Sequence, residues 1–287
     1  MSKKLLMIAY IFPPAGNVGI YRPVKFVKYL PEFGWDPVVL TVRDGKFGKY
    51  DSRLMKIVPE DTPVYRTRSI EWFNEGESSA TEGRPQKRNL LRRIQNRLRM
   101  IINWFAIPDG NISWVPFATI EGVRIIKREG VRHVFATGKP FSAFIVGYLL
   151  KRLTGTKLVI DYRDPWTQNI NYHRRSPVHR WIETAQERAI IRLSDIVIAN
   201  TWVNEELLVR DFGDGQDRAK FITIHNGFDG EDFDAVPEKR DDKFTLTYAG
   251  AFYFSVGSSF KKSAGDEVMQ TYSPLYFFEA LSKLSAR

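Results

Sequence analysis

Short apolar strands alternate with helices along most of this chain, and this alternation is the feature that most restricts its fold. The first predicted strand, residues 5–12, precedes a loop with several glycines and prolines and then a predicted helix over residues 20–30. Helices between successive strands predict a parallel sheet covered on both faces. We therefore expect an α/β, Rossmann-like fold that binds ligands at the carboxyl ends of its strands. Further strands are expected at residues 38–42, 131–136, 157–161, 196–200 and 221–224, and further helices at 141–153, 178–193 and 204–212.

Two polar stretches interrupt the alternation. Residues 71–86 are rich in Glu, Ser, Gly and Arg and predict a flexible loop. After a second polar stretch, a strand at 244–250 and a helix at 274–284 indicate the start of another Rossmann unit. One strand and one helix cannot bury their own faces, so this unit either packs on the first domain or continues in further sequence. The expected organisation is a domain over residues 1–228, a linker over 229–243 and an incomplete second Rossmann unit over 244–287.

A basic amphipathic helix is predicted over residues 84–105. It is basic because residues 84–108 contain several arginines and no Asp or Glu. Its Leu, Ile and Phe residues recur at helical spacing and form a stripe about 120° wide. This composition is typical of a helix in the interface of an anionic membrane. The same helix could instead pack its apolar stripe on the sheet. Nucleic-acid binding is disfavoured because the aromatic residues do not alternate with the arginines. The predicted membrane contacts are Arg88, Arg92, Arg93, Arg97, Arg99 and Trp104.

Charge and composition restrict the function further. The net charge of +10 favours an anionic partner: nucleic acid, an anionic membrane surface or a phosphate-bearing small molecule. The absence of cysteine excludes disulfides, thiolate zinc sites and cysteine nucleophiles, and it fits a reducing cytoplasm. The apolar runs at 5–12 and 141–150 are too short to cross a bilayer, so we expect a soluble or peripheral protein. The spacing of His133, His173, His179 and His225 does not indicate a metal site.

Two loops after predicted strands could bind anions or sugars. Residues 12–19 contain Gly16 and Gly19, which would let backbone N–H groups approach a phosphate. The dinucleotide and Walker spacings are absent, and a plain strand–helix turn explains this loop equally well. In residues 136–142, Thr137 and Ser142 could bind sugar hydroxyls or serve only as helix caps.

A third loop, residues 161–166, follows a buried strand and carries two carboxylates and an arginine. Charges at the end of a buried strand are costly unless they are paired or used. Asp161, Arg163 and Asp164 therefore predict either a structural ion pair or a polar-substrate site in which Trp166 offers a stacking face. The D-x-D sequence at residues 232–234 lies in the predicted linker, away from any strand end.

Five blocks of sequence occur in order over nearly the whole chain. They are FPPAGNVGIYRPVKFVKYLPEFGWDPVVLT, PDGNISWVPFA, ATGKPFSAF, VIDYRDPW, and SDIVIANT followed by ITIHNGFDGEDF and FTLTYAGAFY. Together they resemble the family 4 glycosyltransferases of bacteria, in the branch that modifies cell-surface polysaccharides.

The resemblance implies two facing Rossmann halves, the GT-B arrangement, with the acceptor on the first half and a nucleotide sugar on the second. It implies transfer with retention of configuration and without a metal or other cofactor. The acceptor is expected to be a lipid-linked glycan at the inner face of the membrane, so the protein would be cytoplasmic and peripheral. Residues implied near the donor diphosphate are Gly16, Gly19 and Gly250. Residues implied on the acceptor side are Thr137, Ser142, Arg163 and Asp164, with Trp166 beside them and Asp164 as the catalytic residue.

The chain departs from the family pattern in two ways. Arg163 stands where many relatives have the His of a His-Asp pair, so the catalytic role of that His does not transfer to it. The donor-half Arg/Lys pair and spaced glutamates of relatives are expected beyond Arg287. The alternative function is a non-catalytic module that binds glycan or membrane, or that works with a separate donor subunit. The sequence does not predict an oligomeric state.

Overall fold

The computed structural model describes residues 3–43, 45, 47, 50–70, 104, 106–169, 176–230 and 275–285. The chain divides into two compact units, Met1–Asn226 and Gly227–Arg287. In the second unit, helix α8 (Leu275–Ser285) lies within one residue of the predicted helix. The strand predicted at 244–250 lies outside the described residues.

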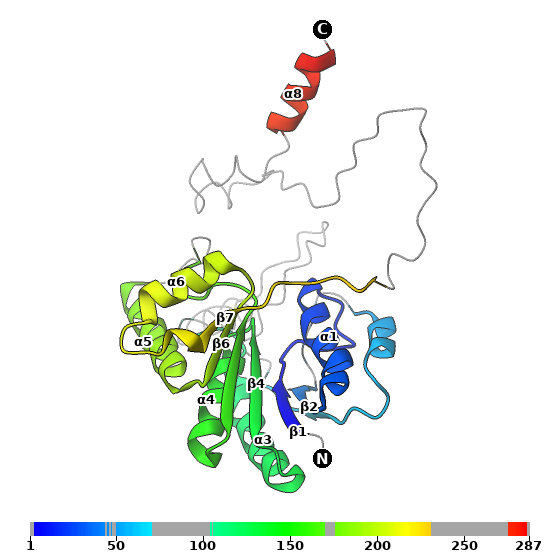
Figure 1. Ribbon diagram of the computed structural model, residues 1–287, viewed down its shortest axis with the longest axis vertical. Helices are drawn as coiled ribbons and strands as arrows, with labels where there is room; N and C mark the ends of the chain where they lie inside the picture. The colour runs from blue at the N-terminus through cyan, green and yellow to red at the C-terminus, as the bar shows by residue number, and fades with distance from the viewer. Residues whose placement is uncertain are drawn as a thin grey trace, which may run out of the picture. The chain divides into compact units, whose positions relative to one another are not determined.

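The first unit contains a sheet of seven parallel strands in the order β3-β2-β1-β4-β5-β6-β7 (Figure 1). Most residues of its central strands β1, β4 and β5 are buried, and their near-continuous apolar sequences are those expected of a parallel sheet. The prediction of a parallel, Rossmann-like α/β fold is confirmed. The strands are β1 (Lys3–Ile8), β2 (Trp35–Val42), β3 (Val64–Thr67), β4 (His133–Gly138), β5 (Lys157–Tyr162), β6 (Ile196–Ala199) and β7 (Phe221–Thr223).

Helices cover both faces of the sheet because right-handed crossovers run in opposite directions from its middle (Figure 1). One face packs on α1, where Met7 meets Val24 and Val27. On the other face Leu6 and Ile8 belong to the core formed with α3, α4, α5 and α6. The helices are α1 (Tyr21–Tyr29), α3 (Val115–Glu129), α4 (Ser142–Thr154), α5 (Pro177–Leu193) and α6 (Trp202–Phe212). Short 3₁₀ turns are η1 (Val18–Ile20), η2 (Leu30–Phe33), η3 (Ser52–Ile57), η5 (Ile112–Trp114) and η6 (Arg218–Lys220).

Strand β3 and helix α3 were not predicted from the sequence. Strand β3 is short and lies at the edge of the sheet, so most of its side chains are only half-buried and the apolar pattern is weak. Helix α3 contains several β-branched residues, which favour strands over helices. Packing decides its structure: Ala118, Ile125 and Ile126 are buried in the core, and the helix ends at Gly130 with φ of 66°.

No helix in the described ranges has the length and hydropathy needed to cross a bilayer. The predicted basic helix over 84–105 lies outside these ranges except for Trp104. The Trp104 side chain is exposed, and its ring packs edge-on against His179 at 4.4 Å between centroids.

Candidate functional site

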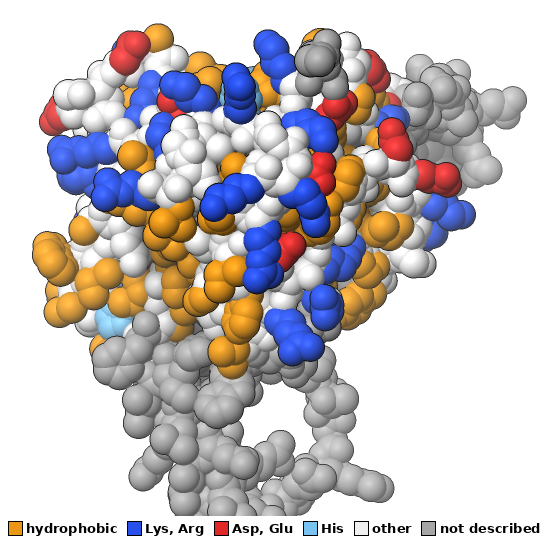
Figure 2. All heavy atoms as spheres, turned by 90° about the horizontal axis from the view of Figure 1, so that it is seen from below, with side chains coloured by type: hydrophobic (Ala, Val, Ile, Leu, Met, Phe, Trp, Pro, Cys, Tyr) orange, Lys and Arg blue, Asp and Glu red, His pale blue; other side chains and the backbone are white. Residues whose placement is uncertain are grey.

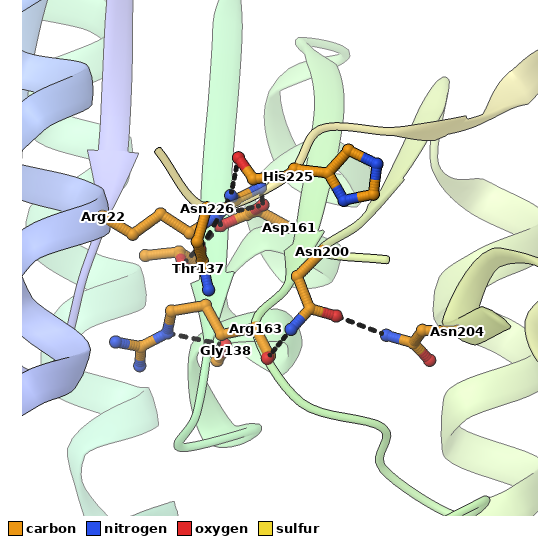
Figure 3. A network of polar contacts seen from close by, with 9 residues as sticks. All are labelled: Arg22, Thr137, Gly138, Asp161, Arg163, Asn200, Asn204, His225 and Asn226. Atoms are coloured by element: carbon orange, nitrogen blue, oxygen red, sulfur yellow. Dashed lines mark hydrogen bonds and ion pairs between the residues drawn. The ribbon is translucent and has the colours of Figure 1, made fainter. Parts of the chain in front are cut away.

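Polar side chains gather at the carboxyl ends of the central strands, where β4 and β5 end next to the start of α1 (Figure 3). Asp161 on β5 is fully buried there. Arg22 of α1 binds it through both carboxylate oxygens, with distances of 3.1 Å from Nε to Oδ1 and to Oδ2 and 2.7 Å from Nη2 to Oδ1. Thr137 of β4 donates a hydrogen bond to Asp161 Oδ2 at 2.8 Å. The structural ion pair that the sequence left open is therefore present, but Arg22 is the partner of Asp161.

Arg22 also contacts the segment that leaves the sheet after β7. Its Nη1 donates to the His225 carbonyl oxygen and to Asn226 Oδ1, each at 3.2 Å (Figure 3). Arg22 thus joins α1, β5 and the last residues of the first unit. Sequence reasoning missed this residue, and its position one turn after the glycine loop is the only signal for it.

Arg163 connects two loops through their backbone carbonyl groups. Its Nε donates to the Gly138 carbonyl oxygen at 2.8 Å, and its Nη atoms donate to the carbonyl oxygens of Gly19 and Lys139. Burial lowers the pKa of Arg163 below its ordinary value. A β-carbon at position 19 would lie 2.6 Å from Arg163 Nη1, so a larger residue there would displace the end of the Arg163 side chain. Gly19, predicted to approach the donor diphosphate, and Arg163, predicted to line the acceptor side of the cleft, are in direct contact.

Gly16 has a different role in packing. A β-carbon there would lie 3.2 Å from the backbone nitrogen of Asp51, which donates to the Pro14 carbonyl oxygen at 2.8 Å. The close approach at Gly16 is therefore to the chain's own backbone. Gly250 and the five arginines predicted to contact a membrane lie outside the described residues.

Three side chains that were predicted to line the acceptor side of the cleft are buried. Thr137 is buried against Asp161. Ser142 donates from its hydroxyl to Asp109 Oδ1 at 2.6 Å and from its backbone nitrogen to Asp109 Oδ2 at 2.9 Å. Trp166 is 0% exposed and stacks on Phe141 with centroids 4.8 Å apart. These side chains support the loops, and the predicted stacking face of Trp166 is wrong.

Asp164 remains accessible at the end of β5. Asp164 is exposed, and its carboxylate makes no ion pair or hydrogen bond with any of the described residues. The preceding residue is held in place, because Asn200 donates to the Arg163 carbonyl oxygen and receives a bond from Asn204 at 3.2 Å (Figure 3). The site thus presents one free carboxylate on a loop that is fixed by buried contacts.

Solved structures similar to this chain share little sequence with it. Anabaena HepE in complex with UDP and glucose is 16% identical, with a TM-score of 0.44 over 82% of this chain and 47% of that chain. The S. aureus MnaA–UDP structure is 16% identical, with a TM-score of 0.42 over 79% and 44%. Apo UGT2 of Phytolacca americana is 10% identical, with a TM-score of 0.46 over 79% and 52%. The chain spans about half the length of these proteins.

No curated protein matches the chain in sequence. The family model described as Glycosyltransferase Family 4 matches residues 78–232, which is more than half of the chain. This match confirms the family predicted from the five sequence blocks. The protein is therefore a member of Glycosyltransferase Family 4.

Proposed function

We propose that this chain is the acceptor-binding part of a retaining GT-B glycosyltransferase that transfers a sugar from a nucleotide-sugar donor to a glycan. The acceptor would be lipid-linked and would belong to cell-surface polysaccharide synthesis, and no metal would be required. The exposed carboxylate of Asp164, at the carboxyl end of β5 in a chain of this family, carries the proposal.

Asp164 is the proposed catalytic residue because it offers an accessible base where an α/β sheet binds its ligands. In the transfer step, the acceptor oxygen forms a bond to the anomeric carbon on the face from which the diphosphate leaves, and the bond from that carbon to the diphosphate breaks, so the configuration is retained. The proton of the acceptor hydroxyl passes to Asp164. Gly16 and Gly19 remain candidates for backbone approach to the donor diphosphate.

Replacement of Asp164 by asparagine tests this role. We expect the rate of sugar transfer to fall by at least about 100-fold, since a positioned acid or base contributes that much. Donor affinity should be nearly unchanged, because the residue is proposed to face the acceptor. The matched control is Asp214→Asn, which removes an exposed carboxylate in the loop after α6.

Transfer rates and donor affinity would be measured together with circular dichroism. Undiminished transfer in Asp164→Asn would exclude the catalytic role. A loss of folding would show that Asp164 is structural instead. If the unaltered protein transferred no sugar from any nucleotide-sugar donor, the non-catalytic alternative would be favoured.

We also propose that the protein binds an anionic membrane surface at the inner face of the membrane. The face seen in Figure 2 carries more Lys and Arg side chains than Asp and Glu, with exposed hydrophobic side chains between them. A hollow of about 520 Å³ beside β3 and α3 combines the same two properties. Glu121 is the only acidic side chain among the described residues that line it, and it pairs with Arg124 at 3.1 Å. The lining residues are Arg43, Val64, Tyr65, Arg66, Thr67, Arg68, Phe117, Ile120, Glu121 and Arg124.

Vesicle binding tests this proposal. We expect binding to phosphatidylglycerol-containing vesicles that weakens steeply with salt, and little binding to pure phosphatidylcholine. The double change Arg68→Glu and Arg124→Glu should weaken binding at least about tenfold, since each basic residue near an anionic surface contributes about 1 kcal/mol. The control Lys56→Glu and Arg192→Glu has the same charge change outside the hollow. Equal binding to neutral and anionic vesicles would exclude the proposal.

A further inference from the structure

Glu187 is a fully buried carboxylate in the middle of α5. Its Oε1 accepts a hydrogen bond from the Tyr162 hydroxyl at 3.0 Å. Its Oε2 accepts from the Thr167 backbone nitrogen at 3.2 Å and also from the Thr167 hydroxyl. Each carboxylate oxygen therefore binds a different residue of the β5–α5 connection.

The two partners of Glu187 stand on either side of the loop that carries Asp164. Tyr162 is the last residue of β5, and Thr167 follows residues 163–166. The Tyr162 side chain is fully buried and Thr167 is buried as well, whereas Asp164 between them in the sequence is exposed. One carboxylate thus holds both ends of a four-residue loop.

Burial of this carboxylate needs an explanation beyond stability. An apolar side chain of similar volume often serves a core equally well or better, because a buried carboxylate loses its hydration. A carboxylate adds directional hydrogen bonds. Here three donors from Tyr162 and Thr167 bind its two oxygens and so fix the residues at both ends of the 163–166 loop. The neighbouring Trp166 is held separately by its stacking on Phe141.

We propose that Glu187 is a positioning residue for Asp164: it clamps both ends of the 163–166 loop and so fixes where the exposed carboxylate stands. This role rests on the proposed function of Asp164 for its catalytic consequence. The clamp itself is a property of the fold and can be tested without any substrate.

Hydrogen exchange in the full chain provides that test. Glu187→Met fills the same space but removes both acceptors, and we expect the amides of residues 166–169 to exchange at least about tenfold faster, as for the loss of a buried hydrogen-bond partner. Glu187→Gln retains an oxygen for Thr167 and an amide for the Tyr162 hydroxyl, so it should restore slow exchange. Ser194→Ala is the matched control, because it removes another buried hydrogen bond of α5, from Ser194 Oγ to the Ile190 carbonyl oxygen at 2.8 Å.

If Glu187→Met does not fold, Tyr162→Phe releases one end of the loop, and Thr167→Val weakens the other end by removing the hydroxyl bond while the backbone bond stays. Unchanged exchange in residues 166–169, or exchange that rises equally in the strands of the sheet, would overturn the clamp.

Kinetics then test the positioning role. In Glu187→Met we expect kcat for sugar transfer to fall at least about tenfold, while the donor KM stays unchanged and Glu187→Gln recovers kcat. Faster loop exchange with unchanged kcat would overturn the positioning role. A complete absence of transfer in the unaltered protein would refute the proposed function, whereas the exchange result would still decide the clamp.

Discussion

Replacing Arg22 with alanine is expected to lower the free energy of unfolding by about 3–5 kcal/mol, the range for removing one partner of a buried ion pair. Asp161 is 0% exposed, and the Arg22 side chain is only 8% exposed. Without the guanidinium, the Asp161 carboxylate would stay buried with only the hydroxyl of Thr137 as a donor among the contacts described above. Urea denaturation of the purified variant measures the effect.

Two comparisons separate charge from lost contacts in this experiment. Adding Asp161→Asn to Arg22→Ala removes the uncompensated charge, so the double variant should be more stable than Arg22→Ala alone. The Arg53 side chain, which pairs with Asp51, is 85% exposed. Replacing Arg53 with alanine should therefore change the free energy of unfolding little. A similar effect of Arg22→Ala and Arg53→Ala would contradict the description of Asp161 as a buried, paired carboxylate.

The Arg22 contacts also explain which parts of the site the sequence could predict. Asp161 ends an apolar strand, so its need for a partner follows from the sequence. The identity of that partner does not, because Arg22 is 139 residues away and only the strand order brings α1 beside β5. Strand order was not part of the prediction, and the nearer Arg163 was the natural candidate.

The buried residues that were predicted to bind the acceptor show a second limit of prediction from the sequence. Ser142 and Trp166 have side chains that suit sugar binding, and both follow strands where ligands bind. Whether a loop side chain points outward depends on the path of the loop. That path is set by distant partners such as Asp109 for Ser142 and Phe141 for Trp166. The alternation of elements therefore predicts the fold and the edge of the sheet that forms the site, whereas the direction of each side chain depends on packing.

Glu187 is expected to make the free energy of unfolding depend strongly on pH. Burial raises the pKa of Glu187 from 4.5 to about 7, although its hydrogen bonds from Thr167 and Tyr162 oppose the rise and the nearby Asp211 adds to it. The folded protein therefore holds this proton more tightly than the unfolded chain does. The resulting stability is fully present below pH 4.5 and is lost as the pH rises through about 7.

The size of this effect follows from the two pKa values. One pKa unit corresponds to about 1.4 kcal/mol, so the rise from 4.5 to about 7 corresponds to about 3 kcal/mol. We expect the free energy of unfolding of the unaltered protein to fall by about this amount relative to Glu187→Gln between a pH below 4.5 and a mildly alkaline pH.

Subtracting the Glu187→Gln curve removes the contributions of other titrating groups, which differ in sign. Burial also raises the pKa of Asp109, whereas it lowers the pKa of His133, so the stability of the unaltered protein alone would not isolate Glu187. Urea denaturation of both proteins across this pH range gives the difference directly. A difference that stays constant would show that Glu187 has the same pKa folded and unfolded. A difference that grows in favour of the unaltered protein with rising pH would show that the three hydrogen bonds stabilise the carboxylate more than burial destabilises it.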